Sequence, residues 1–228
     1  MPGWTESDGF AVNPPHSSDA DFRVLHAMRC IGVASEDRVA IASGIGGLDT
    51  AARLRQLSGQ GLVALGPGPF GGWGLTDAGR TAAAELLRNE LAMTEARGDV
   101  RNGYDSFMDL NSKLLQVCTD WQMCQVGSTH VLNDHLDADY DARVLSRLLR
   151  IDGSAQRICE DLARRLERFG VYGSRLASAL EKALAGDTAY VTDSLESYHS
   201  VWFQLHEDLL VTLGISREAE RRNTSGAG

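Results

Sequence analysis

The stretch between residues 59 and 80 constrains the fold of this chain more than any other. Two glycines end a helical pattern there, and the apolar run 62–65 then predicts a short strand. The following GPGPFGG contains too much glycine and proline for anything but a loop, and the next three residues, WGL, predict a second strand. Thr76 then has the position of an N-cap for a long helix that extends to about residue 96. Two short strands joined by a loop therefore interrupt an otherwise helical sequence.

Three shorter helices are predicted before these strands. Gly32 ends the first of them, and Ser35 is placed as the N-cap of the second, with Glu36 and Asp37 in its first turn. The third helix is expected between about residues 48 and 58. The residues expected on its buried side are Leu48, Ala51, Leu54 and Leu57.

This order of elements resembles the winged helix-turn-helix domains of MarR-like bacterial regulators. The residues that match the cadence of those families are Ser43-Gly44-Ile45, Leu54, Leu57, Gly61-Leu62-Val63, Gly72-Trp73, Leu75-Thr76 and Gly79-Arg80. The resemblance covers roughly residues 21–90, and it implies a domain of three helices and a small two-stranded wing that binds double-stranded DNA. Because winged helices also dock proteins, an adaptor for a metabolic enzyme is the alternative.

Polar residues on and just after the third helix are the candidates for contact with an operator. They are Thr50, Arg53, Arg55, Gln56 and Gln60. Arg53 and Gln56 have the donors and acceptors that match guanine and adenine edges, whereas Arg55 and Gln60 are placed to reach phosphates. A face that carries these residues only for solvation is the alternative. The predicted wing has no Lys or Arg, so DNA binding is expected to need a homodimer.

Residues 104–213 are expected to form a bundle of amphipathic helices. The helices are predicted at about 104–124, 140–148, 158–169, 176–184 and 190–213, with a loop at 127–139 and a break at Asp152-Gly153. The layout resembles the ligand-binding bundle of GntR-type regulators of the FadR class. The stretches CTDWQ, NDH and SYHSVWFQLHEDLL are also similar to those of short actinobacterial regulators, which implies transcriptional regulation and no particular ligand.

Aromatic and imidazole side chains in this second half are candidates for an effector pocket. They are Trp121, His135, His199, Trp202, Phe203 and His206. The last four lie at i, i+3, i+4 and i+7 of one predicted helix, hence along one side of it. A pocket lined by these aromatic and imidazole side chains would suit a small organic acid or an aromatic molecule. The alternative is that the aromatic rings belong to the core and the histidines lie at its margin.

A metal site is the competing hypothesis, and it is disfavoured. Glu196 and His199 form one ExxH, but di-iron bundles need this motif twice together with two further glutamates. The remaining possibility is a metal ion bound by His135 together with His199 or His206. We therefore expect no metal and no cofactor.

Composition excludes several classes of protein. The chain has no P-loop, HExxH or GxSxG motif, its four cysteines lack CxxC spacing, and no enzymatic activity is expected. Neither a run of 18 apolar residues nor a signal-like leader is found, so no membrane contact and a cytoplasmic location are expected. The net charge is −9, yet seven arginines balance seven acidic residues within 21–90, which leaves room for a local DNA-binding face.

These observations predict a mainly α chain with four parts. A disordered tail covers 1–20, and a winged-helix domain with its linker helix covers 21–97. A helical effector and dimerisation domain covers 98–214, and a flexible tail covers 215–228. The function expected of this organisation is regulation of transcription, controlled by a small-molecule effector.

Overall fold

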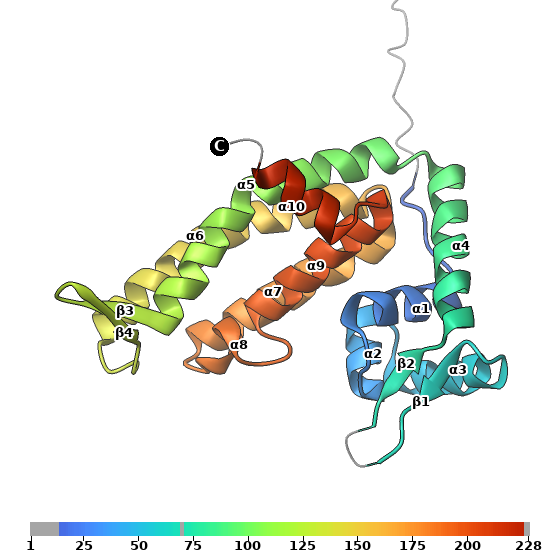
Figure 1. The fold of residues 1–228 in the computed structure, drawn as a ribbon, viewed down its shortest axis with the longest axis horizontal. Helices are drawn as coiled ribbons and strands as arrows, with labels where there is room; N and C mark the ends of the chain where they lie inside the picture. Colours follow the sequence, from blue (N-terminus) through green and yellow to red (C-terminus); the bar gives the residue numbers. More distant parts are fainter. Residues whose placement is uncertain (1–13, 69–70, 226–228) are drawn as a thin grey trace, which may run out of the picture.

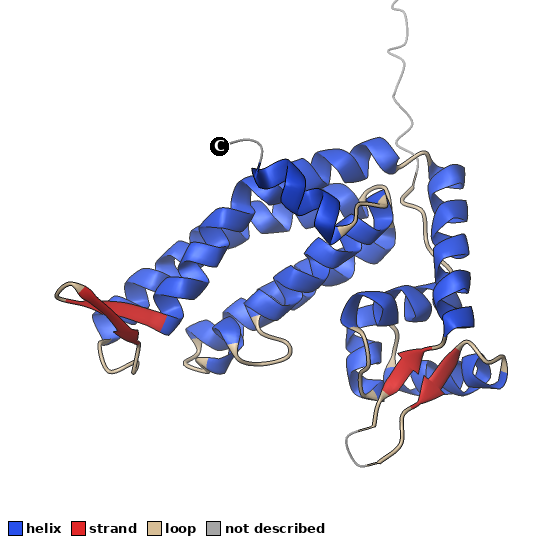
Figure 2. Cartoon of the chain, viewed as in Figure 1, coloured by secondary structure: helices blue, strands red, loops and turns tan. Residues whose placement is uncertain are grey.

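The computed structural model describes residues 14–68 and 71–225, and it confirms the mainly helical class (Figures 1 and 2). These residues form ten α-helices, one short 3-10 helix and two antiparallel sheets of two strands each. The elements are α1 (Ala20–Ile31), α2 (Glu36–Ser43), α3 (Gly47–Gly59), β1 (Val63–Leu65), β2 (Trp73–Leu75), α4 (Asp77–Thr94), α5 (Arg97–Gln122), β3 (Met123–Val126), β4 (Thr129–Leu132), α6 (Ala138–Ala163), η1 (Glu167–Phe169), α7 (Gly170–Leu184), α8 (Ala189–Thr192), α9 (Tyr198–Leu213) and α10 (Arg217–Ser225). None of the helices in the described ranges has the length and apolar character needed to cross a bilayer.

The first half of the chain packs three helices, a small sheet and the start of α4 around one core. The buried residues at its centre include Leu25, Leu54 and Val63. β1 and β2 pair with Val63 opposite Leu75, and Trp73 also forms a bridge to Ala34 in the link between α1 and α2. The elements therefore occur in the predicted order, and Ala34 adds one extended residue next to the sheet.

Local capping explains where these helices begin. The hydroxyl of Ser35 accepts a hydrogen bond from the backbone amide of Arg38 at the start of α2, and Thr76 accepts one from Gly79 at the start of α4. Gly79 also permits a close approach, because a Cβ there would lie 1.9 Å from the carbonyl oxygen of Leu62. This close approach places the first turn of α4 directly against the entry to β1.

The second half is a bundle in which α5 and α6 are long neighbouring helices joined by the β3–β4 hairpin (Figure 1). The hairpin corrects the predicted loop at 127–139, since its strands occupy residues 123–126 and 129–132. Its turn is Gly127-Ser128, and Gly127 has a φ of 63°, a conformation for which glycine is favoured. A two-residue turn that contains glycine and precedes a Thr-x-Val sequence was the signal that sequence reasoning missed.

The predicted break at Asp152-Gly153 was wrong, because α6 continues through both residues. A glycine inside a helix costs about 1 kcal/mol relative to alanine, which packing can offset. Ile151 and Ala155 are buried on either side of Gly153, and the Asp152 carboxylate accepts a hydrogen bond from the Tyr198 hydroxyl. Tertiary contacts therefore carry the helix across a residue that disfavours it locally.

The end of the chain also differs from expectation. The long helix predicted at 190–213 is divided into α8 and α9, and Ser197 caps α9 by accepting a hydrogen bond from Ser200. The segment predicted as a flexible tail from residue 215 instead contains α10, whose Glu220 is hydrogen-bonded to Tyr104 and His206 of the bundle. Buried polar partners, which the sequence does not display, stabilise this last helix.

The predicted N-terminal tail is partly ordered. Residues 1–13 lie outside the described residues, but His16 pairs with the bundle: its amide donates to Arg165 at 3.0 Å and its carbonyl accepts from Glu167 at 3.0 Å. The segment before α1 thus pairs with the link between α6 and η1, far along the chain.

Candidate functional site

The predicted buried side of α3 is confirmed for Ala51, Leu54 and Leu57, but its first turn is rotated relative to the prediction. Thr50 is fully buried and its hydroxyl donates to the Ile45 carbonyl, whereas Leu48 is 91% exposed. The prediction failed because residues three apart are about 60° short of a full helical turn, so a stripe of i+3 steps drifts around the helix. Thr50 is therefore removed from the candidates for DNA contact. Apart from its two terminal glycines, the residues that α3 exposes are Leu48, Asp49, Ala52, Arg55 and Gln56.

Asp21 of α1 binds two of the remaining candidates. The Nη1 atom of Arg53 lies 2.6 Å from the Oδ1 atom of Asp21, and Gln56 Nε2 lies 3.4 Å from Oδ2 of the same carboxylate. In contrast, the side chains of Arg55 and Gln60 form no hydrogen bond or ion pair with another described residue, and both are exposed. Of the two arginines of α3, Arg53 is therefore paired with a neighbouring acid, and Arg55 is without a partner among the described residues.

The six residues predicted for an effector pocket lie in two separate groups. At the hairpin end of the bundle, the ring centroids of Trp121 and His135 are 4.5 Å apart, and His135 Nδ1 lies 2.9 Å from Oδ2 of Asp141. On α9, Trp202 is buried and stacks on Phe107 with centroids 4.2 Å apart. Trp121 and Phe107 are fourteen residues apart on α5, so the two groups lie about 21 Å apart along this helix.

The other predicted residues of α9 differ in their surroundings. Phe203 is 53% exposed beneath the guanidinium of Arg217, while His199 is half-buried. His206 is buried, and its Nε2 lies 2.7 Å from Oε1 of Glu220. Burial lowers the pKa of His206, although Glu220 opposes this shift. The alternative, in which the aromatic rings belong to the core and the histidines lie at its margin, thus describes Trp202 and half-buried His199 but neither exposed Phe203 nor buried His206.

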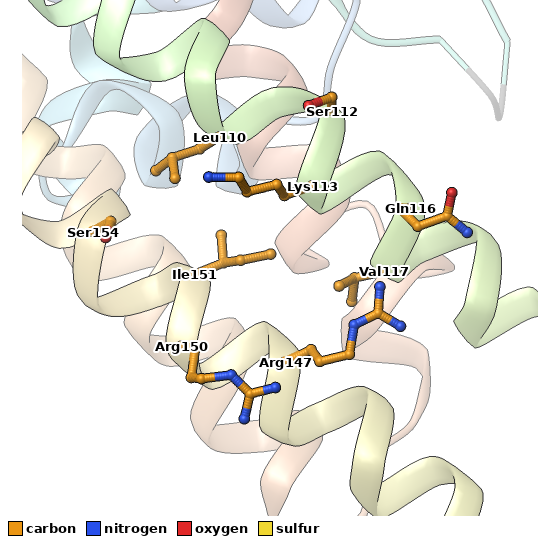
Figure 3. A pocket seen from close by; sticks show the side chains of 9 residues that line it. All are labelled: Leu110, Ser112, Lys113, Gln116, Val117, Arg147, Arg150, Ile151 and Ser154. Atoms are coloured by element: carbon orange, nitrogen blue, oxygen red, sulfur yellow. The ribbon is translucent and has the colours of Figure 1, made fainter.

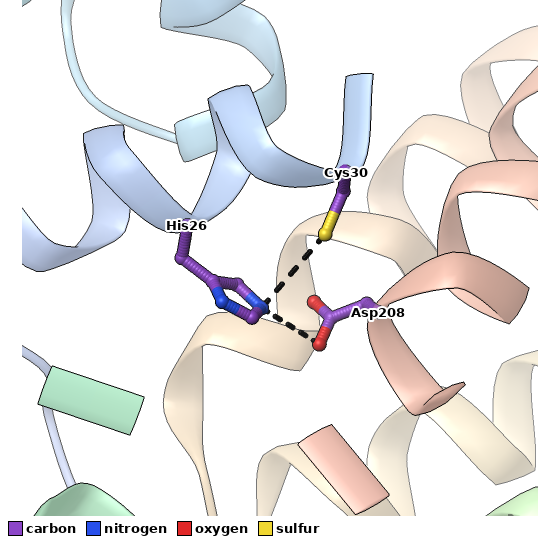
Figure 4. A group of neighbouring side chains, drawn as sticks. All are labelled: His26, Cys30 and Asp208. Carbon is purple, nitrogen blue, oxygen red and sulfur yellow. Dashed lines mark hydrogen bonds and ion pairs between the residues drawn. The ribbon is translucent and has the colours of Figure 1, made fainter. Parts of the chain in front are cut away.

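A buried cluster of charged residues, which the sequence reasoning did not identify, joins the first helices to the bundle. Arg168 of η1 lies at its centre: Nη1 is 2.7 Å from Asp208 Oδ1, and Nε is 2.9 Å from Glu90 Oε2. His26 of α1 approaches the same Asp208 oxygen at 2.8 Å through Nε2 (Figure 4). The cluster thereby connects α1, α4, η1 and α9. The available signal was Asp208 itself, an acidic residue between the apolar positions Leu205 and Leu209.

The electrostatics of the cluster keep its central pair ionised. Burial raises the pKa of Asp208, but the charges of Arg168 and His26 outweigh it and hold this pKa well below its ordinary value. Burial likewise lowers the pKa of Arg168, and Asp208 and Glu90 overcome that effect, so the pKa is raised. Tyr172 and Thr212 donate further hydrogen bonds to the Asp208 carboxylate.

His26, Cys30 and Asp208 are also close enough to be considered as metal ligands, with ligand atoms within 4.8 Å of one another (Figure 4). The guanidinium of Arg168 argues against this role, because Nη1 lies 3.0 Å from His26 Nε2 and already supplies a fixed cation. Burial also raises the pKa of Cys30 well above its ordinary value, which disfavours the thiolate that binds metals. The arrangement is suited to holding helices together.

A cavity of about 570 Å³ lies between α5 and α6 (Figure 3). It is lined by Leu110, Ser112, Lys113, Gln116, Val117, Arg147, Arg150, Ile151 and Ser154. Lys113 extends from α5 and Arg147 from α6 into the space between the helices (Figure 3). Neither Lys113 nor Arg150 forms a hydrogen bond or ion pair with another described residue. The cavity therefore combines unpaired positive charge with an apolar floor.

Comparison with known proteins adds no family to these observations. No protein-family model matches the chain, and no match was found among curated proteins or solved structures.

Proposed function

We propose that this chain is a DNA-binding transcriptional regulator with a winged helix-turn-helix at residues 20–94. The observation that carries the proposal is the order α1–α2–α3–β1–β2–α4 with an antiparallel β1–β2 pair. The bridge between Ala34 and Trp73 supports it further, because it ties the link between α1 and α2 to the small sheet and so joins helices and strands in one domain. In this arrangement α3 is the recognition helix and enters the major groove.

The exposed face of α3 supplies chemistry that fits base edges. Arg55 and Gln56 present guanidinium and amide groups, and Leu48 and Ala52 offer apolar contact to thymine methyl groups. Arg53 joins them once its contact with Asp21 is exchanged for a phosphate or a base. Gln60, at the end of the helix, is placed for backbone contact.

Binding as a homodimer follows from how little positive charge this face carries. Affinity for DNA depends strongly on the number of phosphates that are neutralised, and a single α3 provides only Arg53 and Arg55. Two copies on a palindromic operator double that number and fix the spacing of the recognition helices. We assign dimerisation and the sensing of a small effector to the helical bundle.

The connection between the two halves supports such control. Only Glu95 and Ala96 separate α4 from α5, and Glu95 has a positive φ of 52°. A ligand that prefers one placement of α5 would therefore also bias the placement of α4 and of the DNA-binding helices. Only a difference in affinity between two such states can shift their populations.

The test is fluorescence anisotropy with labelled DNA from the region upstream of the chain's own gene, compared with random DNA over a salt titration. We expect preferred binding to the upstream DNA that weakens with salt, and a loss of roughly tenfold or more in Arg55→Ala. Arg88→Ala is the matched control, because Arg88 is an exposed arginine of α4 and its loss changes the net charge equally. Equal binding to random DNA at low salt would contradict the proposal.

A protein-docking role is the second candidate, and the 91% exposure of Leu48 favours it. Asp49 next to Leu48 would repel a phosphate backbone but not a basic partner. Salt-dependent DNA binding separates the two functions, since a docking module has no reason to prefer the upstream DNA.

A further inference from the structure

We infer that the cavity between α5 and α6 binds a small organic anion, in which a carboxylate or phosphate group is attached to an apolar body. Only the identification of this anion as the effector rests on the proposed function. Binding itself requires no DNA.

The first argument is the imbalance of charge at the cavity. Lys113, Arg147 and Arg150 line it, and of these three cations only Arg147 pairs with a described carboxylate, that of Asp120. Gln116 also donates to Asp120 at 2.7 Å, so that carboxylate is already satisfied. Two cations are thus left without a partner among the described residues, in a chain whose net charge is −9.

The second argument is the floor of the cavity. Val117 and Ile151 are buried and Leu110 is half-buried, and these side chains form an apolar surface between the charged groups (Figure 3). Pockets for small molecules typically have volumes of about 300–1,000 Å³ and combine apolar walls with a few polar groups. The volume of about 570 Å³ therefore admits an acid with a short chain or one ring.

The third argument is the chemistry of the donors. The guanidinium group donates two parallel hydrogen bonds that match a carboxylate or a phosphate, while the lysine ammonium contributes a point charge. The hydroxyl of Ser154 adds a neutral donor on α6. A ligand held by Lys113 on one helix and by the arginines on the other would tie α5 to α6. Since α5 follows α4 after two residues, the bound anion would fix the helix that leads to the DNA-binding half.

The experiment uses the full chain without DNA and the fluorescent anion anilinonaphthalenesulfonate as probe, with octanoate and inorganic phosphate as competitors. We expect saturable binding of the probe that octanoate displaces, and an affinity roughly tenfold lower in each of Lys113→Met and Arg150→Met. Both side chains are exposed, so these variants should keep the wild-type melting temperature. Arg88→Met is the matched control and should bind as the wild type does.

Two results would overturn the inference: no saturable binding, or equal affinity in the Lys113→Met/Arg150→Met double variant and the wild type. Displacement by phosphate as readily as by octanoate would overturn the assignment of an apolar body. The outcome is independent of the operator test. Operator binding without probe binding would contradict the anion site but support the proposed regulator. Probe binding without operator binding would support the anion site but contradict the proposed regulator.

Discussion

The Nη1 atom of Arg168 lies 2.7 Å from the Oδ1 atom of Asp208, and both side chains are almost completely buried. The same guanidinium also binds Glu90 and lies 3.0 Å from His26 Nε2, so four segments of the chain meet at one cation. Removing ions from water costs several kcal/mol per ion unless they are paired with good geometry. This pairing is therefore specific for one placement of the first helices on the bundle.

Arg168→Met should destabilise the protein severely, because it leaves Glu90 and Asp208 buried without their cation. We expect a loss of about 3–5 kcal/mol in the free energy of unfolding, measured by urea denaturation. Arg164→Met is the control: Arg164 is an exposed arginine paired with Asp161, and its loss should cost no more than about 1 kcal/mol. Equal losses in the two variants would show that the buried pair is not the cause.

Asp21→Asn should strengthen DNA binding, since it removes the charge that holds Arg53 at 2.6 Å. A partly exposed pair is worth up to about 1 kcal/mol, which corresponds to roughly fivefold in affinity. The measurement is the anisotropy titration described above, and the control is Glu85→Gln, an exposed acid on α4. Unchanged affinity in Asp21→Asn would mean that Arg53 does not contact DNA.

Acidification should destabilise the bundle through His206. Burial lowers the pKa of this imidazole below its ordinary 6.5, so the folded state binds the proton less readily than the unfolded state. The contribution of the neutral His206 side chain to the free energy of unfolding is fully present above pH 6.5. It is lost as the pH falls through the lower pKa of the folded state. Urea denaturation at pH 7 and pH 5 should show a smaller decrease in unfolding free energy for His206→Gln than for the wild type. A decrease of the same size in both proteins would assign the pH dependence to other groups.

Two glycine-to-alanine substitutions should have opposite effects. Gly79→Ala places a Cβ 1.9 Å from the Leu62 carbonyl oxygen, and the resulting backbone shift should cost about 2 kcal/mol. Gly98→Ala lies in α5 with open space around its Cβ, and it should stabilise the protein by up to about 1 kcal/mol. Thermal melts followed by circular dichroism would measure both. A stabilising Gly79→Ala would contradict the close packing of α4 on the entry to β1.

The elements of the first half were predictable because their signals are local. Ser35 and Thr76 cap the helices that follow them, and glycine and proline mark the loop between the strands. The face of α3 was predictable only in part: Ala51, Leu54 and Leu57 are buried as expected, but Thr50 is buried and Leu48 is exposed. Which side of a helix is buried depends on its neighbours, and the spacing of Leu48, Ala51, Leu54 and Leu57 fits more than one rotation of the helix.

The sites of the second half depend on contacts between distant segments. Lys113 and Arg147 line one cavity only because the hairpin aligns α5 with α6, and the sequence does not fix that alignment. The same holds for Arg168, whose partners Glu90 and Asp208 are far from it along the chain. The histidines attracted attention in the sequence, but the strongest electrostatic features of the fold are arginines.

The cluster around Arg168 bears on how the chain could be divided or recombined. A boundary near residue 97 would separate His26 and Glu90 from the arginine and aspartate that they contact. A fragment of the first half would expose this surface to water, and a chimaera with a different bundle would bury an acid opposite an unrelated side chain. The two halves are consequently not interchangeable modules, and a functional hybrid would have to transfer Arg168 and Asp208 together with the helices they bind.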